Sequence, residues 1–230
     1  MGVFDSVRAV MFDLDNTLIV RKYALRKLAR YISGFYFPRQ TSRHAEIEEL
    51  FCECFINGYN RRKECFERFK EESGMDKSVM FDAFLELWNF YYPYCTVRDP
   101  GAEAVLLLRK RGYGTSILTN GEFVMQNSKI DVAGIREWFS PIITTQEIGV
   151  EKPNPRSFLI ACEKAGFAPK QVAYVGDYWK NDICGAAGVG MRTVWYSAYS
   201  PGWDESAPRA DAEIDSLWKL LDIFCQHFTD

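Results

Sequence analysis

Two different patterns of hydrophobic and polar positions divide this chain. From about residue 97 onward, short apolar runs alternate with longer stretches in which apolar residues recur every three or four positions. Such alternation predicts βα units that assemble into a parallel sheet. An apolar run at residues 10–12 fits the same sheet, because strands covered by helices on both faces are apolar throughout. The predicted strands are residues 10–12, 114–118, 141–145, 171–175, 192–196 and 211–214.

The intervening segment, residues 18–96, has no strand-like alternation and few helix breakers. This pattern predicts helices throughout, at about residues 22–33, 43–56, 61–73 and 77–92. We therefore expect a helical insertion at residues 18–96, within an α/β domain made of residues 1–17 and 97–230. The expected fold class is α/β, with a Rossmann-like parallel sheet that carries helices on both faces and an additional α-helical domain.

The last predicted helix of the insertion carries an aromatic stripe. Phe81, Phe84, Trp88, Tyr91 and Tyr92 recur at three- and four-residue spacings, which places them on one helix face. A stripe at helical spacing usually faces other helices, so we expect it to form the core of the insertion. The alternative is that one of the last three residues contacts an apolar or aromatic part of a substrate.

Length, charge and cysteine content narrow the range of functions. The 28 basic and 31 acidic residues among 230 give a net charge of −3 without a long run of like charge, so we expect no nucleic acid polymer as a partner. No apolar stretch is long enough to cross a membrane. Because the seven cysteines are an odd number and no signal-peptide-like segment precedes the first acidic strand end, we expect reduced thiols and a cytoplasmic protein. The sequence does not indicate an oligomeric state.

Two further groups of residues resemble known sites but are interpreted as structural. His44, Cys52, Cys54 and Cys65 could form a metal cluster. However, Cys-x-Cys is not the usual spacing of zinc ligands, and free cysteine commonly packs as a small apolar residue, so we expect helix core. The glycines at 185–190 resemble a dinucleotide-binding motif, but a helix precedes them and a strand follows, the reverse of the order that this motif needs. They predict a helix end and a tight turn.

Acidic residues follow two of the predicted strands. Asp13 and Asp15 come directly after the first strand, in the sequence DLDNT, and Asp177 and Asp182 follow the fourth strand, in GDYWKND. Ligands of open α/β sheets bind outside the carboxyl ends of the strands, so acids there are placed for chemistry. Burying several carboxylates together is costly unless a cation offsets their charge, and a divalent metal is the simplest one. For Asp13 and Asp15 alone, the alternative is a solvated turn with two acids.

Neutral donors and one lysine lie at the ends of the other strands. Thr119, Asn120 and Gly121 follow the second strand, and their hydroxyl, amide and backbone N–H groups suit an oxyanion. Lys152 lies in the loop EKPNP after the third strand. Three acids can hold Mg²⁺, the lysine and the neutral donors can hold a phosphoryl group, and a carboxylate beside the metal can attack that group.

These four groups, in this order and with a helical insertion directly after the first, resemble the motifs of the haloacid dehalogenase superfamily, whose members are mostly phosphatases. The resemblance covers nearly the whole chain, and it is especially similar to the small phosphatases and nucleotidases of that superfamily that carry a helical cap. It implies that residues 18–96 are such a cap. It further implies a Mg²⁺-dependent hydrolase that removes phosphate from a small phosphorylated metabolite through an aspartyl-phosphate intermediate.

The resemblance also implies a role for each acid of the first motif. Asp13 is expected to be the nucleophile that carries the phosphoryl group. Asp15 is expected to protonate the leaving oxygen and then to activate water, and its backbone carbonyl is expected to bind Mg²⁺. The expected metal ligands are therefore Asp13, Asp15 and Asp177.

The remaining motif residues take supporting roles by the same resemblance. Thr119 and Asn120 are expected to grip the phosphate, Lys152 to neutralise it, and Asp182 to support the fourth motif. A phosphoryl group in an inline transition state gains most from positive charge on its equatorial oxygens, which Mg²⁺ and Lys152 would supply.

Three functions from different classes remain open at this point. The first is a phosphatase acting on a nucleoside monophosphate, a sugar phosphate or a similar metabolite. The second is a carbon–halogen or carbon–phosphorus hydrolase of the same superfamily. The second acid, Asp15, argues against carbon–halogen hydrolysis, because the hydrolases of that class lack it. The third is a catalytically idle binding module, which the complete motifs disfavour.

Overall fold

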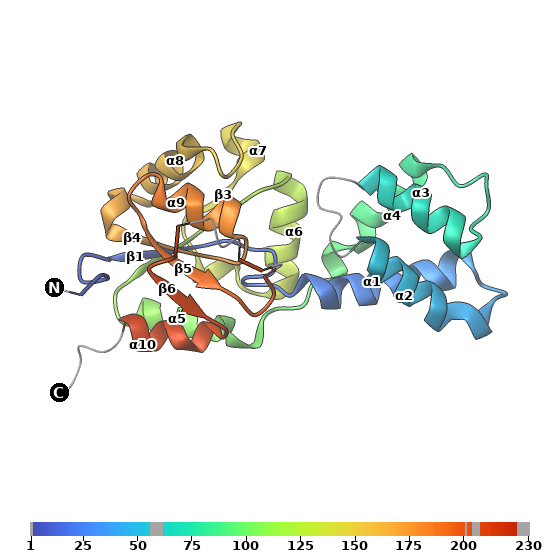
Figure 1. Cartoon of the computed structure of the whole chain (residues 1–230), viewed down its shortest axis with the longest axis horizontal. Helices are drawn as coiled ribbons and strands as arrows, with labels where there is room; N and C mark the ends of the chain where they lie inside the picture. Colours follow the sequence, from blue (N-terminus) through green and yellow to red (C-terminus); the bar gives the residue numbers. More distant parts are fainter. Residues whose placement is uncertain (1, 56–61, 201, 204–207, 225–230) are drawn as a thin grey trace. The chain divides into compact units, whose positions relative to one another are not determined.

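The computed structural model describes residues 2–55, 62–200, 202–203 and 208–224. The chain divides into two compact units, one formed by Met1–Ile19 and Arg98–Asp230 and the other by Val20–Val97. The boundaries between the two units, after Ile19 and after Val97, lie close to the expected limits of the helical insertion, residues 18 and 96. We refer to the first as the α/β unit and to the second as the helical unit (Figure 1). Among the described residues, no helix is long and apolar enough to cross a membrane.

The α/β unit is built on a six-stranded sheet with the order β3-β2-β1-β4-β5-β6. All neighbouring strands are parallel, as predicted. Strand β1 is central, and its last residue Phe12 is in register with Ile117 of β2 and Val175 of β4. The strands are β1 (Ala9–Phe12), β2 (Gly114–Thr119), β3 (Ile142–Thr144), β4 (Val172–Gly176), β5 (Arg192–Tyr196) and β6 (Ala212–Ile214).

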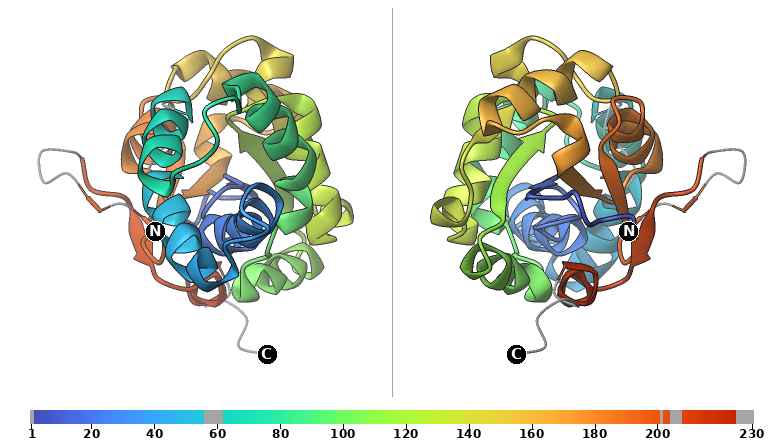
Figure 2. Two further views of the ribbon diagram at one scale, coloured as in Figure 1. Left: turned by 90° about the vertical axis from the view of Figure 1, so that its right-hand side faces the viewer. Right: turned by 90° about the vertical axis from the view of Figure 1, so that its left-hand side faces the viewer.

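Helices cover both faces of this sheet, so the predicted Rossmann-like architecture is confirmed. Side chains of β1 alternate between the faces: Val10 and Phe12 pack into one apolar cluster, and Ala9 and Met11 into another. The first cluster includes residues of α5 (Ala104–Lys110), α6 (Phe123–Ala133) and α10 (Leu220–Phe224), and the second includes residues of α8 (Pro155–Ala165) and α9 (Gly185–Ala187). Figures 1 and 2 show α5 and α10 side by side on the same face.

Two short elements accompany these helices. Helix α7 (Thr145–Ile148), which the hydrophobic pattern did not predict, follows β3 directly. The Thr144 side chain and Glu147 form a capping box at its first turn, which stabilises so short a helix. The glycine-rich segment is α9 followed by a turn in which Gly190 has a φ of 82°, so the predicted helix end and turn are confirmed.

The described residues of the helical unit form four α-helices, α1 (Arg21–Tyr36), α2 (His44–Phe55), α3 (Arg62–Ser73) and α4 (Phe81–Tyr91). The predicted ends at Ile56 and Arg61 lie outside the described residues. Aromatic rings form the core of this unit: Trp88 of α4 lies with its ring centroid 5.1 Å from that of Phe55 in α2. Cys52 and Cys54 are buried in the same helix, and burial raises the pKa of both thiols to about 11. These cysteines therefore serve as core, as expected.

The aromatic stripe of α4 is only partly core. Phe84 and Trp88 are each 1% exposed and pack against α2, as predicted. Tyr91 is partly exposed, and its ring stacks on Tyr31 of α1 with 3.7 Å between centroids. Of the three residues considered for substrate contact, Trp88 and Tyr92 are buried and Tyr91 is partly exposed.

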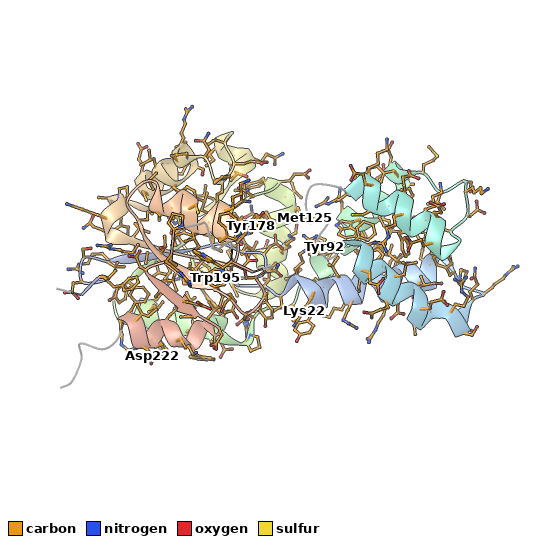
Figure 3. All side chains as sticks on the ribbon, in the orientation of Figure 1. Lys22, Tyr92, Met125, Tyr178, Trp195 and Asp222 are labelled. Carbon is orange, nitrogen blue, oxygen red and sulfur yellow. The ribbon has the colours of Figure 1, made fainter. Side chains whose placement is uncertain are left out.

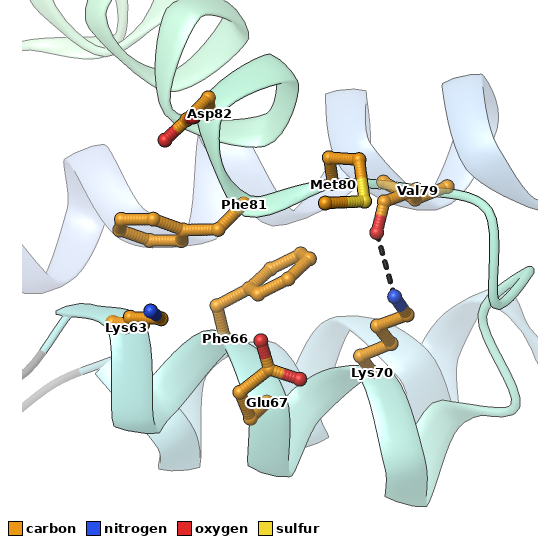
Figure 4. A pocket seen from close by; sticks show the side chains of 8 residues that line it. All are labelled: Lys63, Phe66, Glu67, Lys70, Val79, Met80, Phe81 and Asp82. Carbon is orange, nitrogen blue, oxygen red and sulfur yellow. Dashed lines mark hydrogen bonds between the residues drawn. The ribbon is translucent and has the colours of Figure 1, made fainter.

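Helix α4 begins at Phe81, later than the predicted start at residue 77. The side chain of Asp76 accepts hydrogen bonds from the backbone N–H and hydroxyl of Ser78, at 2.8 and 2.7 Å, and so folds a turn instead of a helix. The ammonium of Lys70 in α3 donates to the Val79 carbonyl at 2.6 Å and fixes the end of this turn (Figure 4). The prediction at this helix end was wrong because a side chain satisfied the backbone groups locally.

Candidate active site

Residues predicted to carry out the chemistry lie together at the carboxyl ends of the strands. Asp13 follows β1, Thr119 ends β2, and Asp177 follows β4. Since β1 lies between the other two strands in parallel register, all three residues occupy the carboxyl ends of adjacent strands. The backbone N–H of Asp13 also donates to the Val175 carbonyl at 2.9 Å, which continues the pairing of β1 with β4 to the first acid.

The loop that carries Asp15 is closed by local hydrogen bonds. The N–H groups of Leu18 and Ile19 donate to the Leu14 carbonyl, both at 3.0 Å. Asn16 has a φ of 61°, a left-handed conformation that asparagine tolerates better than most residues. The sequence DLDNT therefore turns away from the sheet immediately after presenting its two acids.

Lys152 connects acids from two different strand ends. Its ammonium donates to Asp13 Oδ1 at 2.6 Å, to Asp182 Oδ1 at 2.7 Å and to the Tyr174 hydroxyl at 2.9 Å. The Tyr174 hydroxyl in turn donates to the Leu118 carbonyl at 2.8 Å. Lys152 is 4% exposed, so its three donors and its charge are satisfied inside the protein, as a buried ammonium requires.

Asn120 fixes the loop from which Lys152 extends. The amide of Asn120 donates to the Lys152 carbonyl at 3.0 Å, and its oxygen accepts the Lys152 N–H at 2.9 Å. This pair of bonds leaves the Asn120 side chain engaged with backbone. These bonds hold the loop that carries Lys152, a contact that the sequence pattern did not predict. The expected contact of Asn120 with phosphate stays a prediction.

A short helical turn of the π type, Trp179–Cys184, positions Asp182. Asp182 Oδ2 accepts the backbone N–H of Tyr178 at 3.0 Å. A Cβ at Gly176 would lie 2.5 Å from the Asp182 carboxyl carbon, so the approach requires glycine. The Trp195 indole donates to the Asp177 carbonyl at 3.0 Å; Figure 3 labels Trp195 and Tyr178, the residues that hold this segment.

Three carboxylates converge beside the lysine. Oxygen atoms of Asp13, Asp177 and Asp182 lie within 4.8 Å of one another. Burial raises the pKa of Asp13 to about 7, with Lys152 opposing and Asp182 reinforcing the shift. Burial and the charges of Asp182 and Asp13 likewise raise the pKa of Asp177 well above its ordinary value.

Burial is the main cause of both pKa shifts, and the negative charge of the neighbouring carboxylates adds to it. Burial lowers the pKa of Lys152, but Asp13 and Asp182 outweigh that effect and hold it well above the ordinary value, so one ammonium faces three carboxylates. Hard divalent cations bind carboxylate oxygens, and a magnesium ion would neutralise this excess. The donor set therefore fits Mg²⁺.

The side chain of Asp15 lies outside this group, because residues of α6 bind it. The Lys129 ammonium contacts Asp15 Oδ1 at 2.9 Å and Oδ2 at 2.8 Å. The Gln126 amide donates to Asp15 Oδ2 at 3.1 Å and to the Thr119 hydroxyl at 2.7 Å. Helix α6 thus links the acid that follows β1 to the hydroxyl that ends β2.

All seven predicted site residues belong to this group of interacting side chains at the carboxyl ends of the strands and in the loops that follow. Three further members, Tyr174, Gln126 and Lys129, were missed by sequence reasoning. Tyr174 is one hydroxyl in an apolar strand and gives no signal. Gln126 and Lys129 are three positions apart, and so share a helix face; that face, coming directly after the TNG sequence, is the feature that could have identified them.

Comparison with known proteins agrees with this arrangement. The profile of haloacid dehalogenase-like hydrolases matches residues 7–190. A glyceraldehyde 3-phosphate phosphatase from Methanopyrus kandleri is 29% identical, with 94% of this chain and 97% of that protein covered. A phosphoserine phosphatase from Thermus thermophilus is 31% identical, with 82% and 80% covered.

A solved structure also resembles this one along most of its length. It is a phosphatase of the same family from Thermococcus onnurineus, 26% identical, with a TM-score of 0.66 and with 94% of this chain and 97% of that chain covered. With the carboxylates and the lysine gathered where a parallel sheet binds its ligands, the chain belongs to the haloacid dehalogenase-like hydrolases and is a phosphatase of that family.

Proposed function

We propose that this protein is a Mg²⁺-dependent phosphatase of a small phosphorylated metabolite, and that it works through an aspartyl-phosphate on Asp13. The observation that carries this proposal is the contact of the buried Lys152 ammonium with Asp13 Oδ1 at 2.6 Å. It supports a site where a cation lies next to the attacking carboxylate. The oxygens of a phosphoryl group bound at Asp13 would lie next to the positive charge of Lys152, which would stabilise them.

In the first half of the reaction, a carboxylate oxygen of Asp13 attacks phosphorus. The bond from phosphorus to the leaving oxygen breaks, and Asp15 gives its proton to that oxygen. Lys152 and the Thr119 hydroxyl bind phosphoryl oxygens, while Asn120 acts through its two bonds to the Lys152 backbone. When bound, Mg²⁺ supplies additional positive charge that stabilises the transferred group.

In the second half, Asp15 takes a proton from water as the water oxygen attacks phosphorus. The bond between phosphorus and Asp13 breaks, which releases inorganic phosphate and restores both aspartates. The metal would be held by Asp13 and Asp177, with the backbone carbonyl of Asp15. Asp182 Oδ1 accepts a hydrogen bond from the Lys152 ammonium at 2.7 Å and so orients it.

The helical unit is the proposed source of substrate specificity. Residues 18–96 are the predicted cap, and the described part of this unit presents the partly exposed Tyr91 ring. We propose a nucleoside monophosphate or a sugar phosphate as the substrate. Named relatives that act on glyceraldehyde 3-phosphate and phosphoserine support the broader class of small phosphorylated metabolites.

A direct assay separates this proposal from the other hydrolase classes. We expect the purified protein to release inorganic phosphate from 4-nitrophenyl phosphate with added Mg²⁺, and EDTA to abolish that activity until excess Mg²⁺ restores it. A panel of phosphorylated metabolites, scored by released phosphate, then identifies the substrate. Full activity in EDTA, or halide release from a 2-haloacid without phosphate release, would refute the proposal.

A further inference from the structure

The ion pair between Lys129 and Asp15 has no role in the chemistry described above. Lys129 is 4% exposed, and its ammonium contacts both carboxylate oxygens of Asp15, at 2.9 and 2.8 Å. Removing an ammonium from water is costly unless a partner of opposite charge and good geometry offsets the loss. An apolar residue at this position of α6 would avoid that cost, so the lysine calls for a reason beyond packing.

A second side chain of α6 reinforces the first. Gln126, 2% exposed, donates to Asp15 Oδ2 at 3.1 Å and also to the Thr119 hydroxyl at 2.7 Å and the Asn120 carbonyl at 3.2 Å. Because Gln126 and Lys129 share a helix face, α6 holds the Asp15 carboxylate from one direction and ties it to the end of β2. The carboxylate is therefore restrained at both of its oxygens.

We propose that Lys129 is a positioning residue that fixes the Asp15 carboxyl group where it exchanges protons with the leaving oxygen and with water. This inference rests on the proposed function, since it concerns the acid and base of that reaction. Proton transfer requires hydrogen-bond distance between the carboxyl group and the reacting oxygen. A carboxyl group that is free to rotate about its side-chain bonds reaches that geometry less often than one held by two side chains of a helix.

The consequence is a dependence on the leaving group. A nitrophenolate leaves as a stable anion and needs little protonation, whereas an alkoxide needs a proton as it departs. Loss of Lys129 should therefore harm alkyl phosphates more than aryl phosphates. A lysine with a merely structural role would lower both rates by the same factor.

The experiment compares Lys129→Met and Lys129→Arg with wild type on 4-nitrophenyl phosphate and glycerol phosphate, with Mg²⁺ present. We expect Lys129→Met to lower kcat/KM for the alkyl ester by about 10²-fold and for the aryl ester by less than about 5-fold. Lys129→Arg, which keeps the charge, should recover part of the loss. Lys164→Met, the same change at an exposed position of α8, should leave both rates unaltered.

A double-mutant cycle tests whether Lys129 acts through Asp15. In an Asp15→Asn background, we expect Lys129→Met to cause no further loss, because the group that it positions is already absent. Thermal unfolding and circular dichroism confirm that each variant is folded, and Lys129→Arg serves if Lys129→Met is not. Equal losses on both esters, or additive losses in the cycle, would overturn this inference and leave the proposed function standing. Absence of hydrolysis by the wild-type protein would instead overturn both.

Discussion

At the scale of single residues, the site is defined by an imbalance of charge. One buried ammonium, that of Lys152, faces the carboxylates of Asp13, Asp177 and Asp182. Each of the four is less than 8% exposed, so water screens them poorly. A cluster of this kind is costly to fold and is retained where chemistry depends on it.

The nucleophile gives the most direct test at this scale. Asp13→Asn replaces the attacking oxygen by an amide of nearly the same shape, so we expect kcat to fall by on the order of 10⁵-fold. The fold should persist, as measured by circular dichroism. Asp222→Asn, the same change at an exposed position of α10, is the matched control and should retain full activity. Substantial turnover by Asp13→Asn would exclude the aspartyl-phosphate.

At the scale of elements, the carboxyl ends of the strands decide the geometry. Strand β4 ends in Gly176, and the π-type turn that follows returns Asp182 against this glycine. The missing side chain makes room for the carboxylate, since a Cβ there would lie 2.5 Å from its carboxyl carbon. The end of one strand thereby sets the position of an acid six residues further along the chain.

Two strand glycines allow this idea to be tested against a matched control. We expect Gly176→Ala to displace Asp182 from Lys152 and to lower kcat by about 10²-fold, because misplacement by about 1 Å is costly for catalysis. Gly114→Ala in β2 would also crowd a neighbour, the Phe167 ring at 2.8 Å, but it lies away from the carboxyl ends. That variant should lose thermal stability and keep its kcat. Similar kcat values for the two variants would show that Gly176 matters only for packing.

At the scale of the whole molecule, the buried acids couple folding to pH. Burial raises the pKa of Asp13 from 3.8 to about 7, so the folded state keeps a proton that the unfolded state has released between these values. The unfolded state then binds fewer protons, and the free energy of unfolding falls as pH rises through this window.

Metal-free protein should show this dependence directly. In EDTA, we expect the free energy of unfolding, measured by urea denaturation, to decrease between about pH 4.5 and pH 7 more steeply for wild type than for Asp13→Asn. Added Mg²⁺ should reverse the loss at neutral pH, because a ligand that binds only the folded state stabilises it. Identical slopes for the two proteins would mean that Asp13 ionises normally in the fold.

The sequence by itself determined the parallel sheet, the helical insertion and the acids at the strand ends. These features follow from local pattern: apolar runs predict buried strands, and the residues after a strand must lie at its end. The sequence could not determine which side chains bond to each other there. That depends on register, which brings Tyr174 beside Met11 and so places its hydroxyl against Lys152.

Only the tertiary structure showed that Asn120 holds the Lys152 backbone and that Lys129 holds Asp15. A lysine in the middle of a helix is ordinarily solvent-exposed. The hydrophobic periodicity of the sequence did not predict that Lys129 would be buried. Its burial arises because α6 packs against the sheet with this face inward, next to a carboxylate that is 114 residues away in sequence. Contacts of that separation are decided by how the elements pack, and no local pattern encodes them.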